Sequence, residues 1–247
     1  MKTALLIAAM ACVVTAPVAA PVAAQAAPET NQPRLTGFPF TDEDLNYTIV
    51  WPTGISLGDA HLHARRAGQK WNFSFTLDAG IPGYTVKDSY RSDVDPGPGS
   101  DYCTTAFDRS STHGARVMNE KETVDRARGV AIRPGKDGAK VEIPVQSCVK
   151  DALAYLFYAR QEMGQGRVPS AQDVLLGALH PIRVDYDGGP VITMNGKQVQ
   201  SDKVTCTWRN GDTAYSFEVY FARDAARTPL RITAPFAVGT FSMDLVR

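Results

Sequence analysis

Hydrophobic and polar residues alternate strictly over parts of the chain, and this period of two predicts half-buried β-strands. The clearest example is segment 70–78, whose hydrophobic positions are Trp71, Phe73, Phe75 and Leu77. Three further segments of the N-terminal half have the same extended character: 47–51, 55–65 and 84–93. Glycine and proline recur about every 8–15 residues, as expected between many short strands.

Three dipeptides of the C-terminal half lie between extended segments: Asp187-Gly188, Asn195-Gly196 and Asn210-Gly211. Such pairs favour the tight turns that match the twist of an antiparallel hairpin. Together they predict a four-strand meander.

Two of these turns also predict a register. A two-residue loop at Asn195-Gly196 places Ile192 opposite Val199. The same loop at Asn210-Gly211 gives three pairs: Trp208 with Thr213, Cys206 with Tyr215, and Val204 with Phe217. The apolar side chains then share one face, which favours an antiparallel sheet.

Segment 151–163 has the period of a helix instead. Its apolar residues recur at spacings of three and four, and Gly164 follows. A lone amphipathic helix must bury its apolar stripe on the sheet or plug the mouth of a barrel. We therefore predict a mainly β fold, a curved antiparallel sheet of about ten strands or a half-open barrel, with one amphipathic α-helix packed on it or plugging it. We expect this helix to cover the apolar faces of segments 71–77 and 215–221.

The first 26 residues predict a signal peptide. A charged start at Lys2 precedes an apolar run over 4–16 and a small-x-small cleavage site at Ala24-Gln25-Ala26. The run is shorter than the roughly 20 residues that a membrane-spanning helix needs, so we expect no transmembrane anchor. An alternative makes Cys12 a lipid-attachment site. The expected location is the periplasm.

The remaining chain divides into a polar, flexible lead-in over 27–36 and a single mainly-β domain over 37–247. Removal of the leader takes away Lys2 and no acid, which leaves 25 basic and 26 acidic side chains. This balance does not favour nucleic acid or an anionic membrane surface as a partner.

Three cysteines remain after cleavage: Cys103, Cys148 and Cys206. An oxidising compartment favours one disulfide and one thiol. Cys206 alternates inward with Val204 and Trp208, which indicates a buried free thiol. We therefore predict a disulfide between Cys103 and Cys148.

Enzyme motifs are missing from the sequence. It has no Gly-x-Ser-x-Gly elbow, no His-Glu-x-x-His, no phosphate-binding glycine loop and no dinucleotide fingerprint. We expect no cofactor, and a non-catalytic protein is favoured. A metal-dependent enzyme is the remaining catalytic alternative.

The candidate metal ligands are His61 and His63, which a strand would place on one face together with Asp59. Zinc could take both imidazoles with further ligands from neighbouring strands. The competing interpretation is a solvated polar face. A second cluster, Asp224, Arg227 and Pro229, has the residues of a turn, and Arg227 is left to bind an anionic group or to pair with Asp224.

Four segments carry a resemblance to a known family: the helix 151–160, the segment 221–232, a final strand with Gly239, and the opening segment 45–60. They resemble one exported bacterial family, which is catalogued as domain of unknown function 3108. The resemblance covers roughly residues 45–245. It implies an envelope protein with a curved antiparallel sheet, similar to the half-barrel of lipoprotein carriers, and it implies no assigned chemistry.

Two functions then remain. The first is a binding module for a lipid or other apolar or amphipathic molecule, and the second is a structural or assembly factor that contacts envelope proteins. For the first, the candidate ligand-binding residues are Trp71, Phe73, Phe75, Leu153, Phe157 and Phe217. Because a packed core and a ligand cavity require the same alternation, the pattern leaves both open.

Overall fold

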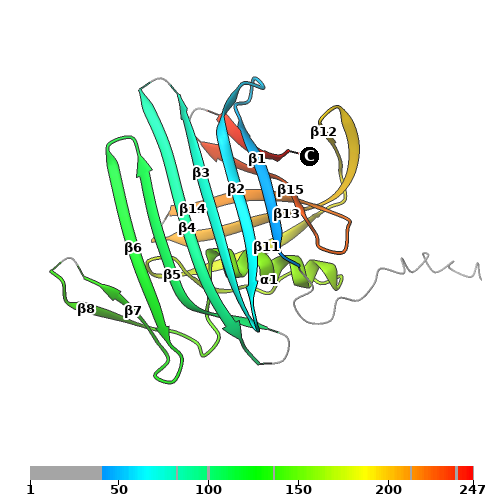
Figure 1. Ribbon diagram of the computed structural model, residues 1–247. Coiled ribbons are helices and arrows are strands. Elements are labelled where there is room, and N and C mark those ends of the chain that lie inside the picture. Colours follow the sequence, from blue (N-terminus) through cyan, green and yellow to red (C-terminus); the bar gives the residue numbers. More distant parts are fainter. Residues whose placement is uncertain are drawn as a thin grey trace, which may run out of the picture. The chain divides into compact units, whose positions relative to one another are not determined.

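Sixteen strands form one long sheet in the part of the chain that the structure describes. The computed structural model (Figure 1) describes residues 41–81, 83–98, 101–135, 137–211, 213–236 and 239–246. All of them belong to one compact unit, Pro33–Arg247. The predicted signal peptide, the lead-in and Cys12 lie outside the described residues.

The first half of the chain contributes nine strands: β1 (Glu43–Val50), β2 (Ser56–Ala67), β3 (Lys70–Ile81), β4 (Tyr84–Pro96), β5 (Tyr102–His113), β6 (Arg116–Asp125), β7 (Val130–Pro134), β8 (Lys140–Pro144) and β9 (Lys150–Asp151). Helix α1 (Ala152–Gly164) follows. The second half contributes β10 (Gln172–Leu175), β11 (Leu179–Gly188), β12 (Val191–Met194), β13 (Lys197–Asn210), β14 (Thr213–Ala222), β15 (Pro229–Phe236) and β16 (Gly239–Leu245).

The strand order confirms the predicted mainly β fold. The path runs β8-β7-β6-β5-β4-β3-β2-β1-β16-β15-β14-β13-β11-β10-β9, and the sheet does not close by pairing its two end strands. Its neighbours pair antiparallel except β9 and β10, which are parallel. The structure has more strands than the roughly ten we predicted, because β7 to β10 and β12 are short and carry little alternation.

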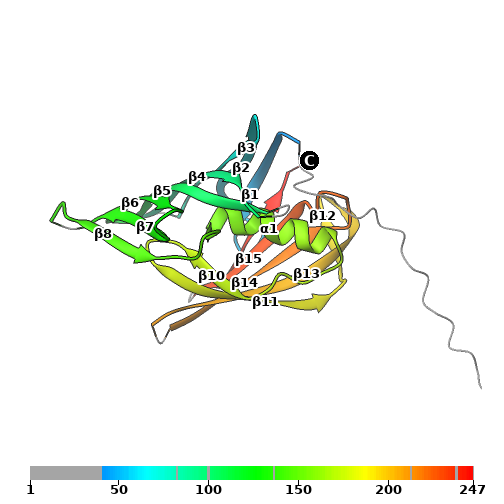
Figure 2. The same ribbon diagram turned by 90° about the horizontal axis from the view of Figure 1, so that it is seen from below.

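Helix α1 lies between two walls of this sheet (Figures 1 and 2), with β1 to β6 on one side and β10 to β15 on the other. Leu153 and Phe157 pack into a core with Trp71 and Phe73. Tyr155 and Met163 pack into a second core with residues of β10, β11, β13 and β14. The helix is therefore buried on more than the single stripe we predicted. None of the described helical residues forms a segment long and apolar enough to cross a membrane.

A buried carboxylate begins the helix. Asp151 is the N-cap, and its Oδ1 accepts hydrogen bonds from the backbone N–H groups of Leu153 (2.8 Å) and Ala154 (3.0 Å). The hydroxyls of Ser92 and Thr104 donate to its Oδ2 at 2.5 and 2.7 Å. Burial raises the pKa of Asp151, and these hydrogen bonds oppose the rise. The cap thus fixes the helix to β4 and β5.

An ion pair fixes the middle of the helix. The guanidinium of Arg160 is fully buried and donates to both carboxylate oxygens of Glu43 at 2.7 and 2.8 Å. Its Nε donates to the carbonyl of Ala226 at 3.0 Å, and the group lies over the ring of Phe157. Helix α1 is thereby tied to β1 and to the segment before β15.

The turn at Asn195-Gly196 confirms the prediction. Both residues have positive φ, 49° and 74°, as a type I′ turn requires, and Ile192 pairs with Val199. The prediction at Asn210-Gly211 was wrong by two residues in register, because Asn210 is itself paired with Thr213. A shift of two residues keeps the same face inward.

The predicted meander is wrong at Asp187-Gly188. Strands β11 and β12 both pair with β13, at Ile182 to Gly188 and at Val191 to Met194. They follow one another along the same partner instead of folding back. The dipeptide makes a β-bulge, because the pairing shifts between Tyr186 and Gly188, and Gly188 has φ 98°.

Candidate functional site

The sheet curves around helix α1 (Figures 1 and 2), and part of its inner, concave face extends beyond the area that the helix covers. On β3, Trp71 and Phe73 are 2 % and 1 % exposed, whereas the next two inward residues are only half-buried. The register continues this half-buried area across β4, β5 and β6. We call it the uncovered patch; it consists of Phe75, Leu77, Asp88, Tyr90, Arg109, His113, Met118 and Glu120.

The uncovered patch is amphipathic. Phe75 and Tyr90 lie side by side with ring centroids 5.9 Å apart, and the Arg109 guanidinium lies 5.6 Å from the Tyr90 centroid. Arg109 Nη1 contacts Glu120 Oε2 at 3.4 Å, and burial raises the pKa of Tyr90. His113 Nε2 lies 3.1 Å from a carboxylate oxygen of Asp88. Apolar rings, an ion pair and a histidine–carboxylate contact therefore share one accessible surface.

The structure separates the predicted ligand-binding residues. Trp71, Phe73, Leu153 and Phe157 form packed core, with the rings of Phe73 and Phe157 stacked at 3.9 Å. Phe75 belongs to the uncovered patch. Phe217 lies apart on β14, half-buried and 5.7 Å from the ring of Trp208. Of the other residues expected beneath the helix, Tyr215 is 43 % exposed.

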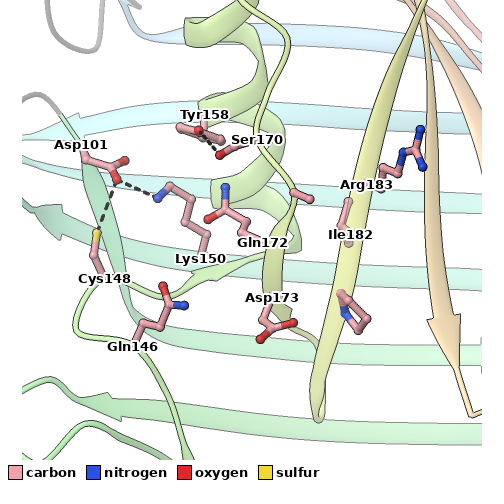
Figure 3. A pocket seen from close by; sticks show the side chains of 12 residues that line it. Asp101, Gln146, Cys148, Lys150, Tyr158, Ser170, Gln172, Asp173, Ile182 and Arg183 are labelled. Atoms are coloured by element: carbon pink, nitrogen blue, oxygen red, sulfur yellow. Dashed lines mark hydrogen bonds and ion pairs between the residues drawn. The ribbon is translucent and has the colours of Figure 1, made fainter.

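A polar groove lies beside helix α1 at Tyr158 (Figure 3). Its volume is about 680 Å³, and it opens between the segment before α1 and strands β10 and β11. Twelve residues line it: Asp101, Gln146, Cys148, Lys150, Tyr158, Ser170, Ala171, Gln172, Asp173, Pro181, Ile182 and Arg183.

A buried lysine organises this groove. The Lys150 side chain is 4 % exposed, and its Nζ donates to Asp101 Oδ2 at 2.8 Å. The same Nζ lies 4.6 Å from the ring centroid of Tyr158, whose hydroxyl is 3.2 Å from that of Ser170. Cys148 Sγ also lies 3.7 Å from Asp101 Oδ2. That approach is a contact only, because a disulfide sulfur has no proton to donate.

The predicted disulfide joins Cys103 to Cys148 in the structure, and Cys206 is a buried free thiol. Burial raises the pKa of the Cys206 thiol to about 12, which keeps it protonated and unreactive. Gly97 packs directly against the bridge, because a Cβ at this position would lie 2.2 Å from Cys103 Sγ.

His61 and His63 project from the outer face of β2 with parallel rings 6.2 Å apart. His61 Nδ1 lies 2.7 Å from the side-chain oxygen of Asn46, and His63 Nδ1 contacts Asp44. No group of three or more potential metal ligands occurs among the described residues. The geometry supplies these two imidazoles with neighbours on β1 and not with a third ligand.

The cluster around Arg227 is structural. Arg227 has φ 48°, and its buried guanidinium donates to Asp202 Oδ2 at 2.6 Å, so its carboxylate partner is Asp202 and not Asp224. Asp224 accepts from the N–H and hydroxyl of Thr228 at 3.0 and 2.7 Å. The carbonyl of Pro229 accepts from the buried Tyr47 hydroxyl. Segment 221–232, which carries part of the family resemblance, is therefore bonded to helix α1 through Ala226 and to β13 through Arg227.

The sequence did not indicate the residues of the groove. Lys150, Gln172 and Asp173 lie on the short strands β9 and β10, where alternation is too brief to assign a face. One signal was present: Asp151 directly before an apolar helical period is typical of an N-cap. This N-cap signal would have placed Lys150 directly before the start of the helix.

A solved structure shares this fold. It is a beta-barrel-like protein of domain of unknown function DUF1849 from Brucella abortus, with a TM-score of 0.55 and 8 % sequence identity, and the match covers 84 % of this chain and 97 % of that one. No curated protein matches the chain. A family model described as a protein of unknown function, DUF3108, matches residues 46–246, and the chain belongs to that family.

Proposed function

We propose that this protein is an exported, non-catalytic binding module of the periplasm that holds an amphipathic molecule against the uncovered patch. One observation carries the proposal. Half-buried apolar side chains adjoin the Arg109–Glu120 ion pair and the His113–Asp88 contact on the concave face, at the point where helix α1 stops covering it. An acyl chain would cover Phe75 and Leu77, and a polar head would meet Asp88, Arg109 and Glu120.

The chemistry of the patch favours an amphipathic ligand over a purely apolar one. Covering Phe75 and Leu77 would gain about 25 cal/mol for each Å² of apolar surface removed from water. The neighbouring charges would lose hydration under a purely hydrocarbon ligand, at a cost that a polar head group avoids. The predicted leader and the disulfide between Cys103 and Cys148 support a location outside the cytoplasm.

Thermal unfolding with a defined lipid tests the proposal. The probe is lysophosphatidylcholine below its micelle concentration, with glycerophosphocholine as the same head group without a chain. A ligand that binds only the folded state of a protein raises the unfolding temperature of that protein. We expect the lipid to raise the midpoint and the head group alone to leave it unchanged.

Two substitutions locate the site. Phe75→Asn on the uncovered patch should weaken lipid binding about tenfold, which corresponds to about 1.4 kcal/mol. Ile55→Asn, at a residue that is 63 % exposed outside the patch, should leave binding unchanged. No stabilisation of the parent protein by the lipid, or equal losses in both variants, would reject the binding function and leave the assembly role as the better candidate.

A further inference from the structure

The polar groove between the segment before α1 and strands β10 and β11 is a second potential binding surface, separate from the uncovered patch. Its volume of about 680 Å³ is within the range of roughly 300–1,000 Å³ typical of small-molecule sites. From its lining side chains and their ion pairs we infer that this groove binds a neutral, polyhydroxylated ligand such as a short saccharide segment. The inference does not depend on the proposed lipid function.

Unused hydrogen-bonding groups converge on the groove. The side chains of Gln146, Gln172 and Asp173 line it from two different segments (Figure 3). None of the three has a side-chain hydrogen bond or ion pair to another residue in the described part of the chain. A carboxamide offers two donors and one acceptor oxygen, and a carboxylate offers acceptors. Sugar hydroxyls, which donate and accept at once, match this set.

The charges of the groove largely cancel. Lys150 is paired with Asp101, and Arg183 is paired with Asp185 at 2.7 Å. This leaves Asp173 as the one lining charge without an ion pair among the described residues. The groove therefore lacks the free cations that an anionic ligand needs, and its polar walls do not suit an acyl chain.

Side chains supply most of the accessible hydrogen-bonding groups of the groove. Peptides commonly bind by adding a strand to an unpaired sheet edge. Strand β10 pairs with β11 through Gln172 to Leu175, whereas β9 pairs only with Val174 and Leu175, so Gln172 and Asp173 have a partner strand on the β11 side alone. An edge of two residues offers a peptide little backbone pairing, and the hydroxyls of Tyr158 and Ser170 add to the side chains that suit a sugar.

The lysine gives the groove a fixed wall. Lys150 is held between the Asp101 carboxylate and the Tyr158 ring, and the disulfide at Cys148 restrains the segment that carries it. Because this wall is held in place before binding, a sugar would lose little binding free energy in ordering it.

Titration with two neutral trisaccharides, maltotriose and N,N′,N″-triacetylchitotriose, tests the inference by nuclear magnetic resonance of the ¹⁵N-labelled protein. Concentrations up to about 10 mM cover dissociation constants in the millimolar range. We expect at least one sugar to shift the amide signals of residues 146–150 and 170–173. No shift with either sugar, or shifts only with triglycine as the peptide probe, would overturn the inference.

A matched pair of variants completes the test. The double substitution Gln146→Ala and Gln172→Ala should weaken sugar binding about tenfold, because the sugar would lose its hydrogen bonds to both carboxamides. Gln198→Ala, an exposed glutamine on β13 outside the groove, is the control and should bind as the parent does. An equal loss in the control would also overturn the inference, and unchanged unfolding temperatures would show that all variants are folded.

Discussion

Two neighbouring rows of side chains cross the concave face of β3 to β6 and differ sharply in burial. The covered row runs Phe73, Ser92, Phe107 and Glu122, which are 1 %, 0 %, 0 % and 0 % exposed. The next row runs Phe75, Tyr90, Arg109 and Glu120, and all four are half-buried. The two rows are only two positions apart along each strand, with one outward-facing residue between them.

The difference comes from what lies above each row. Phe157 of helix α1 stacks on Phe73, and the Asp151 cap accepts from Ser92, whereas Phe75 contacts a neighbouring aromatic ring of its own sheet. Strand alternation is the same in both rows. A covering element thus converts one part of an amphipathic face into core and leaves the next part accessible to a ligand.

Truncating the helix ring that covers the first row, and then one ring of the second row, gives the largest expected effect. Phe157→Ala should lower the free energy of unfolding by about 4–5 kcal/mol, in the upper part of the range for buried rings, because Phe157 is 1 % exposed and stacked. Phe75→Ala should cost about 1–2 kcal/mol, since Phe75 is only partly buried. Chemical denaturation measures both, and equal losses would mean that Phe75 is also core.

Removing the disulfide beside the covered row has the next largest expected effect. Cys103 and Cys148 are 45 residues apart, and the chain-entropy estimate for a loop of this size is about 4 kcal/mol. The double variant Cys103→Ala and Cys148→Ala should lose this amount in denaturant titrations. Reductant should bring the parent protein to the same stability and leave the variant unchanged; a parent insensitive to reductant would contradict the prediction.

A pH effect at the border of the covered row is the smallest. Burial raises the pKa of Glu122 to about 7, the nearby N–H of Gly177 opposes this, and Glu120 adds to it. Neither carboxyl oxygen of Glu122 has a hydrogen bond of good geometry in the described structure. Arg133 and Asp151, the other charged groups near it, act in opposite directions on the pKa of Glu122.

The sign of this effect follows from proton binding. Between the ordinary carboxyl pKa of 4.5 and about 7, the folded protein holds a proton at Glu122 that the unfolded chain releases. Stability should therefore fall by about 1–2 kcal/mol as the pH rises through this window, less than full linkage predicts because water can reach a relaxed carboxylate. Glu122→Gln should remove this slope in thermal unfolding, and an unchanged slope would assign it to other groups.

Much of the fold was predictable because local signals carried it. The alternation in 70–78 identified the inward face of β3, and the positive φ values of Asn195 and Gly196 are those that an Asn-Gly turn prefers. Asp187-Gly188 has similar turn chemistry but lies in a bulge. A dipeptide favours a tight backbone conformation without specifying which strands it joins, so the meander was wrong there.

The candidate sites were less predictable. Trp71, Phe73 and Phe157 follow the same pattern as Phe75, and the pattern does not show which of them a helix covers. The groove brings Asp101, Lys150 and Gln172 together from three places in the chain. Their convergence depends on the disulfide, the helix cap and the parallel pairing of β9 with β10.

The sequence by itself determined the strands with clear alternation and their inward faces, the helix and the cysteine pair, because these depend on local periodicity and on residue chemistry. Tertiary structure alone decided which half of the concave face became core, where Arg160 and Arg227 found their carboxylates, and where the polar groove lies. The physical reason is that burial and charge pairing depend on neighbours far apart in the chain. Glu43 and Arg160, for example, are 117 residues apart.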